Sequence, residues 1–166
     1  NLVVILGSSS PDFVWLLNND CVIQSGCLEA LLECAQSRPE VAIWGATLLE
    51  SDGQTIQCAG GCFYNRWLSS YRQFGRGMPV SQRDRLEAVE FSYVSGASLF
   101  LPIRTLTESL MPARKLGPNG IGGCGEFLNE SYFLYFEELD LAQRLEPGLA
   151  MGWCRNALIT HAGGQS

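Results

Sequence analysis

A short polar cluster that ends in a carboxylate follows an apolar run near the start of the chain. The run is Phe13–Leu17, and the cluster is Asn18, Asn19 and Asp20. Five consecutive apolar residues predict a strand that is covered on both faces, and ligands of open α/β sheets gather just beyond the carboxyl ends of the strands. Asp20 is then placed to hold a cation. The alternative is a turn in which these side chains cap the backbone.

Two adjacent carboxylates, Glu137 and Glu138, follow an aromatic run near the other end of the chain. Such a pair is costly to desolvate unless a helix N-terminus, a cation or a substrate donor stabilises it. A general base must be ionised before it takes a hydroxyl proton. The pair is therefore the candidate catalytic group, with Glu137 as the base and Glu138 as the fallback. The alternative is a pair that only caps the helix.

His161 is the only histidine of the chain, and it follows the apolar residues 158–159 and Thr160. A lone histidine is ordinarily a packed or surface residue, but the end of a strand favours a ligand role. Carboxylate plus imidazole suits Mn²⁺, or Mg²⁺ with more water in its shell. We predict that Asp20 and His161 converge on one ion. A separation above about 10 Å would exclude a shared site, because ligand bonds are only about 2.0 to 2.6 Å long.

Four motifs occur in a fixed order along the chain. They are residues 16–20 (Leu-Leu-Asn-Asn-Asp), 93–97 (Tyr-Val-Ser-Gly-Ala), 132–141 with the acidic pair, and 161–164 (His-Ala-Gly-Gly). In this order they resemble the nucleotide-sugar glycosyltransferases of the GT-A fold, and the inverting, rhamnosyltransferase-like branch of family 2 matches best. The resemblance runs from about residue 13 to residue 166. It is specific for the family and weak for the substrate.

The resemblance implies an α/β fold with an open mixed sheet flanked by helices. It also implies a metal-dependent, inverting transfer of a sugar from a nucleotide-diphosphate donor to a saccharide or lipid-linked acceptor, in bacterial surface polysaccharide synthesis. In related transferases the residues matching Asp20 and His161 bind the ion, Mn²⁺ or Mg²⁺, that holds the donor diphosphate, and one of the acidic pair deprotonates the acceptor hydroxyl. Family members often show Asp-x-Asp where this chain has a single carboxylate, although the Asn form recurs in the rhamnosyltransferase-like branch.

Further residues are expected to contact the two substrates. Those on the donor side are Asn18, Asn19, Asp20, Gly96 and Ala97. The glycine allows close approach of the backbone to a ligand. On the acceptor side we expect Trp67 and Asp140, although Asp140 has a structural alternative in which it binds the backbone or an arginine. Aromatic residues that suit stacking on a sugar are Trp15, Trp44, Tyr64, Trp67 and Trp153. Most of them are expected in the core, and Trp67 is the best candidate for exposure.

The first half of the chain predicts a helix, a strand and a hairpin. Ser25 is the expected N-cap of a helix with an apolar side at 28, 31, 32 and 35, which ends before Pro39. Residues 41–45 predict the next strand, and residues 48–49 and 55–57 flank the turn 51–54 as a hairpin. Residues 58–85 lack clear periodicity, so we expect a long surface loop, which we assign to the acceptor side.

The second half predicts strands over residues 89–94 and 97–101, followed by a short helix that begins at Pro102. The glycine-rich residues 117–125 form either a lid or a plain linker. A helix is expected over residues 138–145, stopped by Pro147 and Gly148. Residues 158–160 then predict the last strand, which carries His161 to its end.

Length and charge narrow the class of protein. The 166 residues fit one domain with a single core. The net charge of −6 and the lack of a dense basic run argue against nucleic acid as a partner. No apolar stretch approaches the roughly 20 residues that span a bilayer, which leaves peripheral membrane contact open. We expect a cytoplasmic protein, with the inner face of the cytoplasmic membrane as its alternative place.

The seven cysteines do not form a disulfide framework, because their number is odd and they scatter through apparent core segments. Cys58 and Cys62 are the only close pair, and no Cys-x-x-Cys occurs. A zinc site at this pair is the alternative to the expected state, which is reduced and mostly buried thiols in a cytoplasmic protein.

The chain begins with Asn1, and its first segment, Leu2–Leu6, looks like an interior strand with no helix after it. In the resembled family several dozen residues that hold the nucleotide base separate such a strand from the Asn-Asn-Asp segment. We therefore expect a fragment that lacks much of the N-terminal nucleotide-binding half, with either a cut chain or missing residues near Gly7.

Two other functions compete with the transferase. One is a catalytically silent sugar- or nucleotide-binding module of the same fold, which a truncated start favours. The other is a nucleotidyltransferase, which also places acidic metal ligands after α/β strands; the lack of a glycine-rich basic phosphate loop near Leu6 counts against it.

Overall fold

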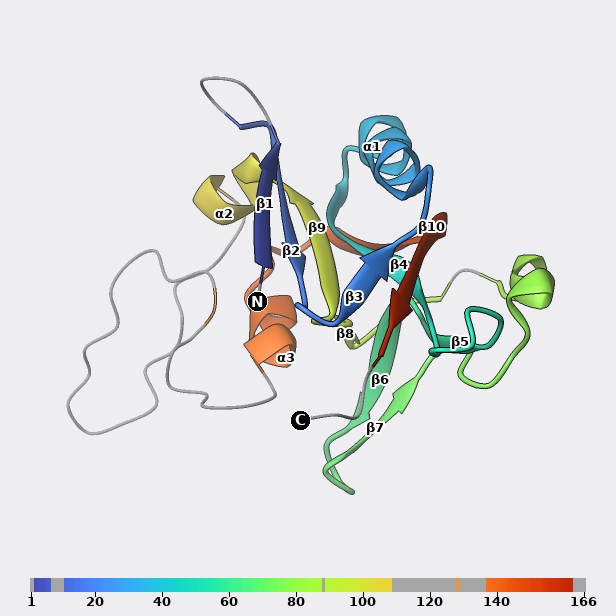
Figure 1. Ribbon diagram of the computed structural model, residues 1–166. Helices are drawn as coiled ribbons and strands as arrows, with labels where there is room; N and C mark the ends of the chain where they lie inside the picture. Colours follow the sequence, from blue (N-terminus) through green and yellow to red (C-terminus); the bar gives the residue numbers. More distant parts are fainter. Residues whose placement is uncertain (1, 7–10, 88, 109–127, 129–136, 163–166) are drawn as a thin grey trace.

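The computed structural model describes residues 2–6, 11–87, 89–108, 128 and 137–162, which build a mixed α/β fold around one large sheet (Figure 1). The strands of this sheet follow the order β1-β2-β9-β4-β10-β3, and β5 pairs with β4 beside this path. They are β1 (Leu2–Leu6), β2 (Phe13–Leu17), β3 (Cys21–Ile23), β4 (Val41–Leu49), β5 (Ile56–Ala59), β9 (Ser98–Pro102) and β10 (Ala150–His161). A second sheet has the order β7-β6-β8, with β6 (Gly61–Asn65), β7 (Ser70–Gln73) and β8 (Tyr93–Val94).

Strand β4 is the axis of the large sheet, and each of its nine residues is buried. It runs parallel to β10 and antiparallel to β9 and β5. Trp44, Ala46 and Leu48 belong to one hydrophobic core, whereas Ile43 belongs to another. Because side chains alternate between the faces of a strand, both faces of β4 must be covered. This explains why its sequence is apolar throughout.

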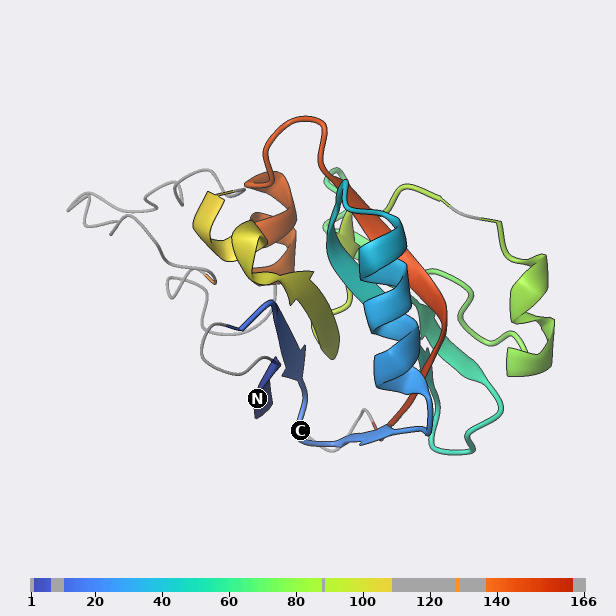
Figure 2. The same ribbon diagram turned by 90° about the horizontal axis from the view of Figure 1, so that it is seen from above.

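Helices cover the two faces of the large sheet (Figure 2). Helix α1 (Cys27–Ser37) packs its buried residues Cys27, Leu31 and Ala35 into the core that holds Trp44. On the opposite face lie α2 (Ile103–Glu108) and α3 (Glu137–Gln143), and Leu106 and Leu141 pack into the core that holds Ile43. The expected mixed sheet with flanking helices is thus present.

The predicted first helix is confirmed, but its N-cap is wrong by one residue. Gly26, not Ser25, occupies the cap position, with a φ of 78° and no side-chain hydrogen bond to the helix. A left-handed φ costs glycine little because it has no Cβ, so the backbone conformation at the cap selects glycine over serine. The helix ends at Ser37, just before Pro39, as the restriction on residues that precede proline requires.

The expectation of a long loop over residues 58–85 is wrong. Strands β6 and β7 pair in an antiparallel hairpin, with Tyr64 opposite Tyr71, and a 3₁₀ helix, η1 (Val80–Arg85), follows. Alternation of buried and exposed residues is weak here because β7 is largely exposed on both faces. The hydrophobic pattern that reveals a half-buried strand is therefore absent from the sequence.

The remaining predicted strands are present, but their lengths or positions in the sheet differ from those expected. The hairpin around residues 51–54 is confirmed by the pairing of Leu49 with Ile56. Residues 89–94 yield only the two-residue strand β8, whereas β10 is far longer than the three residues expected. Strand β1 lies at the end of the sheet order and pairs only with β2 among the described strands, antiparallel, so it is an edge strand and not the interior strand expected.

Three predictions fall on residues outside the described ones: the segment missing near Gly7, the lid or linker over residues 117–125, and the aromatic run 132–136. Among the described helices, none has the length and apolar character needed to cross a bilayer.

Candidate active site

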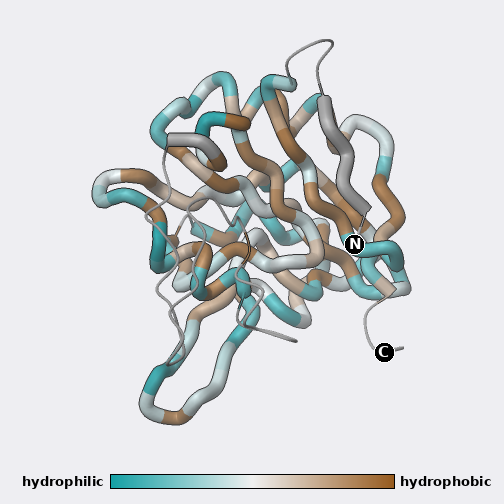
Figure 3. The backbone as a smooth tube through the Cα atoms, turned by 90° about the vertical axis from the view of Figure 1, so that its left-hand side faces the viewer, coloured by the Kyte–Doolittle hydropathy of each residue, from teal (hydrophilic) through white to brown (hydrophobic). Residues whose placement is uncertain are grey.

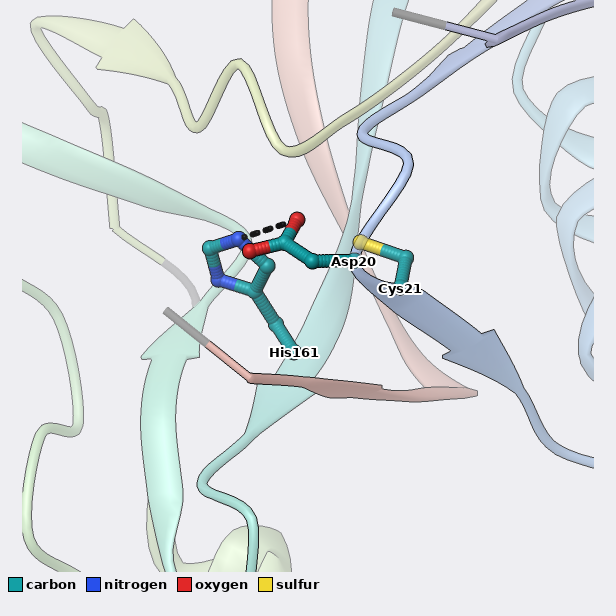
Figure 4. Close-up of side chains that lie close together, drawn as sticks. All are labelled: Asp20, Cys21 and His161. Atoms are coloured by element: carbon teal, nitrogen blue, oxygen red, sulfur yellow. Dashed lines mark ion pairs between the residues drawn. The ribbon is translucent and has the colours of Figure 1, made fainter. Parts of the chain in front are cut away.

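Asp20 and His161 meet at one edge of the large sheet, where β2 and β10 both end (Figure 4). The Nε2 atom of His161 lies 3.2 Å from Oδ1 of Asp20. Two backbone features bring them together: β3 pairs with β10 so that Cys21 lies opposite His161, and the Ala162 amide donates to the Asp20 carbonyl at 3.1 Å. The predicted convergence is therefore present, at a separation far below the limit for a shared site.

The His161 ring is fixed on its other side by Gln57 of β5. Its Nδ1 lies 2.7 Å from the Gln57 Oε1, an acceptor that suits the tautomer with the proton on Nδ1. In the neutral ring this leaves the Nε2 lone pair directed toward Asp20, which is the orientation of a metal-ligating histidine held by a second partner. The imidazole is 14% exposed and the Asp20 side chain 41% exposed, so the site opens to solvent on the carboxylate side.

Cys21 is the third member of this cluster. One ligand atom from each of Asp20, Cys21 and His161 lies within 4.8 Å of the others, and in the part of the chain that the structure describes this is the one such group of metal-binding side chains. The Cys21 thiol donates to the Ala97 carbonyl at 3.5 Å. Burial, with a further contribution from the Asp20 carboxylate, raises the pKa of Cys21 to about 11.

Ala97 also anchors the predicted donor-side cluster, because its carbonyl accepts from the Asn18 amide at 3.1 Å. The Asn18 carbonyl in turn accepts from the Cys21 amide at 3.2 Å, which closes the turn that presents Asn19 and Asp20 to solvent. The turn and the cation-binding position are thus compatible: the backbone forms the turn, and the Asp20 carboxylate stays available to His161.

Gly96, the residue before Ala97, contacts Glu138 of the acidic pair. The Glu138 carboxylate packs against Gly96 so closely that a Cβ at this glycine would overlap it. Burial, followed by the charge of Glu137, raises the pKa of Glu138, while a backbone hydrogen bond opposes the shift. The Oε2 atom of Glu137 is buried and has no hydrogen-bond partner among the described residues. Such a carboxylate oxygen can accept a hydrogen bond or a proton.

Tyr93 and Cys62 complete the surroundings of Glu138. They lie opposite each other in the pairing of β8 with β6. Burial, then the interaction with Cys62 and finally the charge of Glu138, raises the pKa of Tyr93 above its ordinary value. Glu138 thus lies near Cys62, at the start of strand β6.

The remaining predicted residues separate from this cluster. Asp140 forms an ion pair with Arg144 at 2.8 Å, with side chains 13% and 7% exposed, which corresponds to the structural alternative for Asp140. Trp67 lies at the far end of the hairpin and is 83% exposed. The indoles of Trp15 and Trp44 are buried in the core, and Trp153 donates to Thr47 at 2.9 Å. Trp67 is therefore the indole among these candidates that is free to meet a ligand.

Gln57 and Cys21 were not predicted as site residues from the sequence. Gln57 lies on the predicted hairpin, but its place beside His161 depends on the pairing of β5 with β4 and of β4 with β10. Cys21 depends on β3, a three-residue strand with two exposed positions that leaves no hydrophobic pattern. Two features of the sequence could have indicated them. Cys21 directly follows Asp20, and Gln57 is a polar residue within an otherwise apolar strand.

A glycosyltransferase is the class of protein to which comparison with known proteins points. The chain is 27% identical over 158 residues, 86% of its length, to the N-acetylglucosaminyl-diphospho-decaprenol L-rhamnosyltransferases of two Mycobacterium tuberculosis strains, CDC 1551 / Oshkosh and ATCC 25618 / H37Rv. The match covers 43% of the length of these relatives, so the chain spans less than half of each. No family model matches the chain, and no solved structure matches it. The similarity supports a transferase at the level of the family.

Proposed function

We propose that the chain is part of an inverting, metal-dependent glycosyltransferase that moves a sugar from a nucleoside-diphosphate donor to a lipid-linked saccharide. The observation that carries the proposal is the convergence of Asp20 and His161. Two adjacent residues connect this cluster to the acidic pair: the Ala97 carbonyl accepts from Asn18 in the turn before Asp20, and Gly96 contacts Glu138. The similarity to N-acetylglucosaminyl-diphospho-decaprenol L-rhamnosyltransferases supports the proposed substrate class.

The donor set fits a divalent cation that prefers oxygen and imidazole. Asp20 and His161 would hold Mn²⁺, or Mg²⁺ with more water, and the ordered contact of His161 with Gln57 supplies the second partner that such a ligand needs. A bound divalent ion offsets the negative charge that grows on a departing diphosphate.

The acidic pair supplies the other half of the reaction. The acceptor hydroxyl oxygen forms a bond to the anomeric carbon as the bond from that carbon to the diphosphate oxygen breaks, and the electron pair leaves with the nucleoside diphosphate. The hydroxyl proton passes to the Glu137 carboxylate, whose buried Oε2 is free of partners among the described residues. Attack from the face opposite the leaving group inverts the anomeric centre.

The direct test is transfer in vitro. The chain is incubated with Mn²⁺, a panel of nucleoside-diphosphate sugars that includes the rhamnose donors, and N-acetylglucosaminyl-diphospho-polyprenol. Transfer with inverted anomeric configuration, read by NMR, is the expected result. Retained configuration would overturn the single displacement. Binding of donor without transfer from any member of the panel would instead support a catalytically silent binding module of the same fold.

A further inference from the structure

The β6–β7 hairpin displays large apolar side chains to solvent at its tip. Trp67, Leu68 and Tyr71 are 83%, 74% and 63% exposed, and they are half of the exposed large hydrophobic residues in the described part of the chain. The hairpin stands away from the body, and a hydrophobic segment marks its far end (Figure 3). Contiguous exposed apolar groups of this kind mark interaction sites and are otherwise a liability.

The tip is built by specific contacts. The Asn65 side chain accepts from the amides of Trp67 and Leu68 at 3.0 and 3.2 Å, which fixes the turn. Ser69 adopts a φ of 45°, in the left-handed region that is unusual for a residue other than glycine. A backbone held in this way keeps the indole and the leucine side chain outward.

Charge is segregated onto the same region. Residues 53–83 contain four arginines and no Asp or Glu, so this segment carries +4 in a chain whose net charge is −6. The Arg66 guanidinium lies 4.9 Å from the Trp67 ring, and that of Arg72 lies 4.7 Å from the Phe63 ring. Exposed aromatic residues beside arginines are the composition of protein segments that rest at the headgroup level of a bilayer.

We infer that the tip of the β6–β7 hairpin docks on an anionic lipid bilayer through Trp67, Leu68 and Tyr71, with Arg66 and Arg72 contacting the headgroups. The extended chain from Cys62 in β6 to Arg66, the residue after β6, spans about 13 Å. Cys62 lies beside Tyr93 near Glu138. Docking at the tip therefore places the acidic pair a short distance above the membrane surface. The choice of a membrane that carries the acceptor rests on the proposed function, whereas the docking itself does not need it.

Vesicle binding tests the inference without donor or acceptor. The chain is mixed with phosphatidylcholine vesicles with and without phosphatidylglycerol, and the bound fraction is measured by sedimentation. Trp15 and Trp44 are buried in the core, Trp153 is only partly exposed and Trp67 is 83% exposed, so an aqueous quencher acts mainly on the emission of Trp67. We expect binding to the anionic vesicles, a blue shift of emission and protection of Trp67 from the quencher.

Variants separate the tip from the rest of the surface. Trp67→Ala combined with Leu68→Ala should lower vesicle affinity about tenfold or more, and Arg66→Gln and Arg72→Gln about fivefold each. Val89→Ser and Arg85→Gln, at exposed positions outside the hairpin, should bind like the unaltered chain, and circular dichroism verifies that each variant is folded.

Two results of the vesicle assay would overturn the inference: no sedimentation of the unaltered chain with anionic vesicles, or equal binding by the Trp67→Ala, Leu68→Ala double variant. A concentration-dependent emission shift without vesicles would also overturn it, because it would assign the tip to self-association. Failure of sugar transfer leaves all of these readouts unchanged, so docking and the proposed function fail separately.

Discussion

Glu137 and Glu138 are adjacent but have different surroundings. Glu138 packs against Gly96 beside Tyr93, whereas Glu137 has a buried oxygen without a partner among the described residues. Glu138 is held in place by its contacts with the protein, which suits a positioning role. The unpaired oxygen of Glu137 can accept a proton. This difference favours Glu137 as the base, in the order that the sequence suggested.

Replacing Glu137 with Gln should therefore lower kcat about 100-fold or more while donor affinity survives, because the amide keeps the shape but cannot accept a proton. Steady-state transfer kinetics measure this, with Glu146→Gln, an exposed acid beyond the same helix, as the control. Near-normal turnover by Glu137→Gln together with loss in Glu138→Gln would move the role to Glu138. Normal turnover by both would make the pair a helix cap only.

Glu138 also predicts a pH dependence of stability. Burial first, and the Glu137 charge next, raise its pKa in the folded chain above the ordinary value of 4.5. The folded state then binds the proton more tightly than the unfolded state, so this stabilisation is fully present below about pH 4.5 and is lost as pH rises through the raised pKa. Glu138→Gln should melt above the unaltered chain at pH 7, and the gap should close near pH 4. Thermal melts across this range measure it, and a gap independent of pH would contradict the shift.

At the scale of elements, two glycines differ in what surrounds them: Gly45 lies in β4, and Gly96 lies in the turn between β8 and β9. A Cβ on Gly45 of β4 would overlap the Gly60 backbone, whereas one on Gly96 would meet the end of the Glu138 side chain. Backbone cannot move aside cheaply, but a flexible side chain can. A side chain at Gly45 should therefore affect folding stability, whereas one at Gly96 should affect the position of Glu138 in the site.

We expect Gly45→Ala to lower the free energy of unfolding by about 1 to 3 kcal/mol, as overpacking of a core does, and Gly96→Ala to lower it less while displacing Glu138 and reducing turnover. Urea denaturation and transfer kinetics on the same preparations separate the two effects. Equal stability losses in both variants, with turnover unchanged in Gly96→Ala, would contradict the contacts described.

The β6–β7 hairpin carries the acceptor-side prediction. Trp67→Ala should raise the KM for a lipid-borne acceptor about fivefold, the equivalent of the roughly 1 kcal/mol that an aromatic contact contributes, without abolishing donor hydrolysis. A water-soluble acceptor separates two causes: direct contact of Trp67 with the saccharide raises its KM as well, whereas docking on the bilayer leaves it unchanged. An unchanged KM for both acceptors would make Trp67 irrelevant to the acceptor.

Elements with a strong hydrophobic pattern could be predicted from the sequence. Strand β2, strand β4 and helix α1 bury continuous or periodic apolar residues, so their existence follows from the residues alone. The strands β3 and β7 could not be predicted, because most of their residues are exposed and their pairing depends on partners far along the chain. Glycine at the cap of α1 was missed because the backbone angle, not a side-chain hydrogen bond, decides that position.

At the scale of the whole molecule, the sheet order explains why the site could be anticipated only in part. Asp20 and His161 each end an apolar strand, and a shared edge brings strand ends together, so their meeting follows from the pattern. Gln57 reaches His161 only through the sequence of pairings β5 to β4 to β10, which no local pattern encodes. The helices on both faces leave this edge of the sheet as the place where the polar side chains gather.

In the proposed function, Asp20 and His161 hold a divalent ion that binds a nucleoside diphosphate. Isothermal titration of uridine, thymidine and guanosine diphosphates into the chain, with Mn²⁺ and with a chelator, tests it directly. We expect at least one diphosphate to bind about tenfold or more tightly with Mn²⁺, and we expect Asp20→Asn and His161→Gln to lose this gain, while Glu29→Gln, an exposed acid on α1, keeps it. Equal binding with the chelator, or a full Mn²⁺ effect in Asp20→Asn, would contradict the claim.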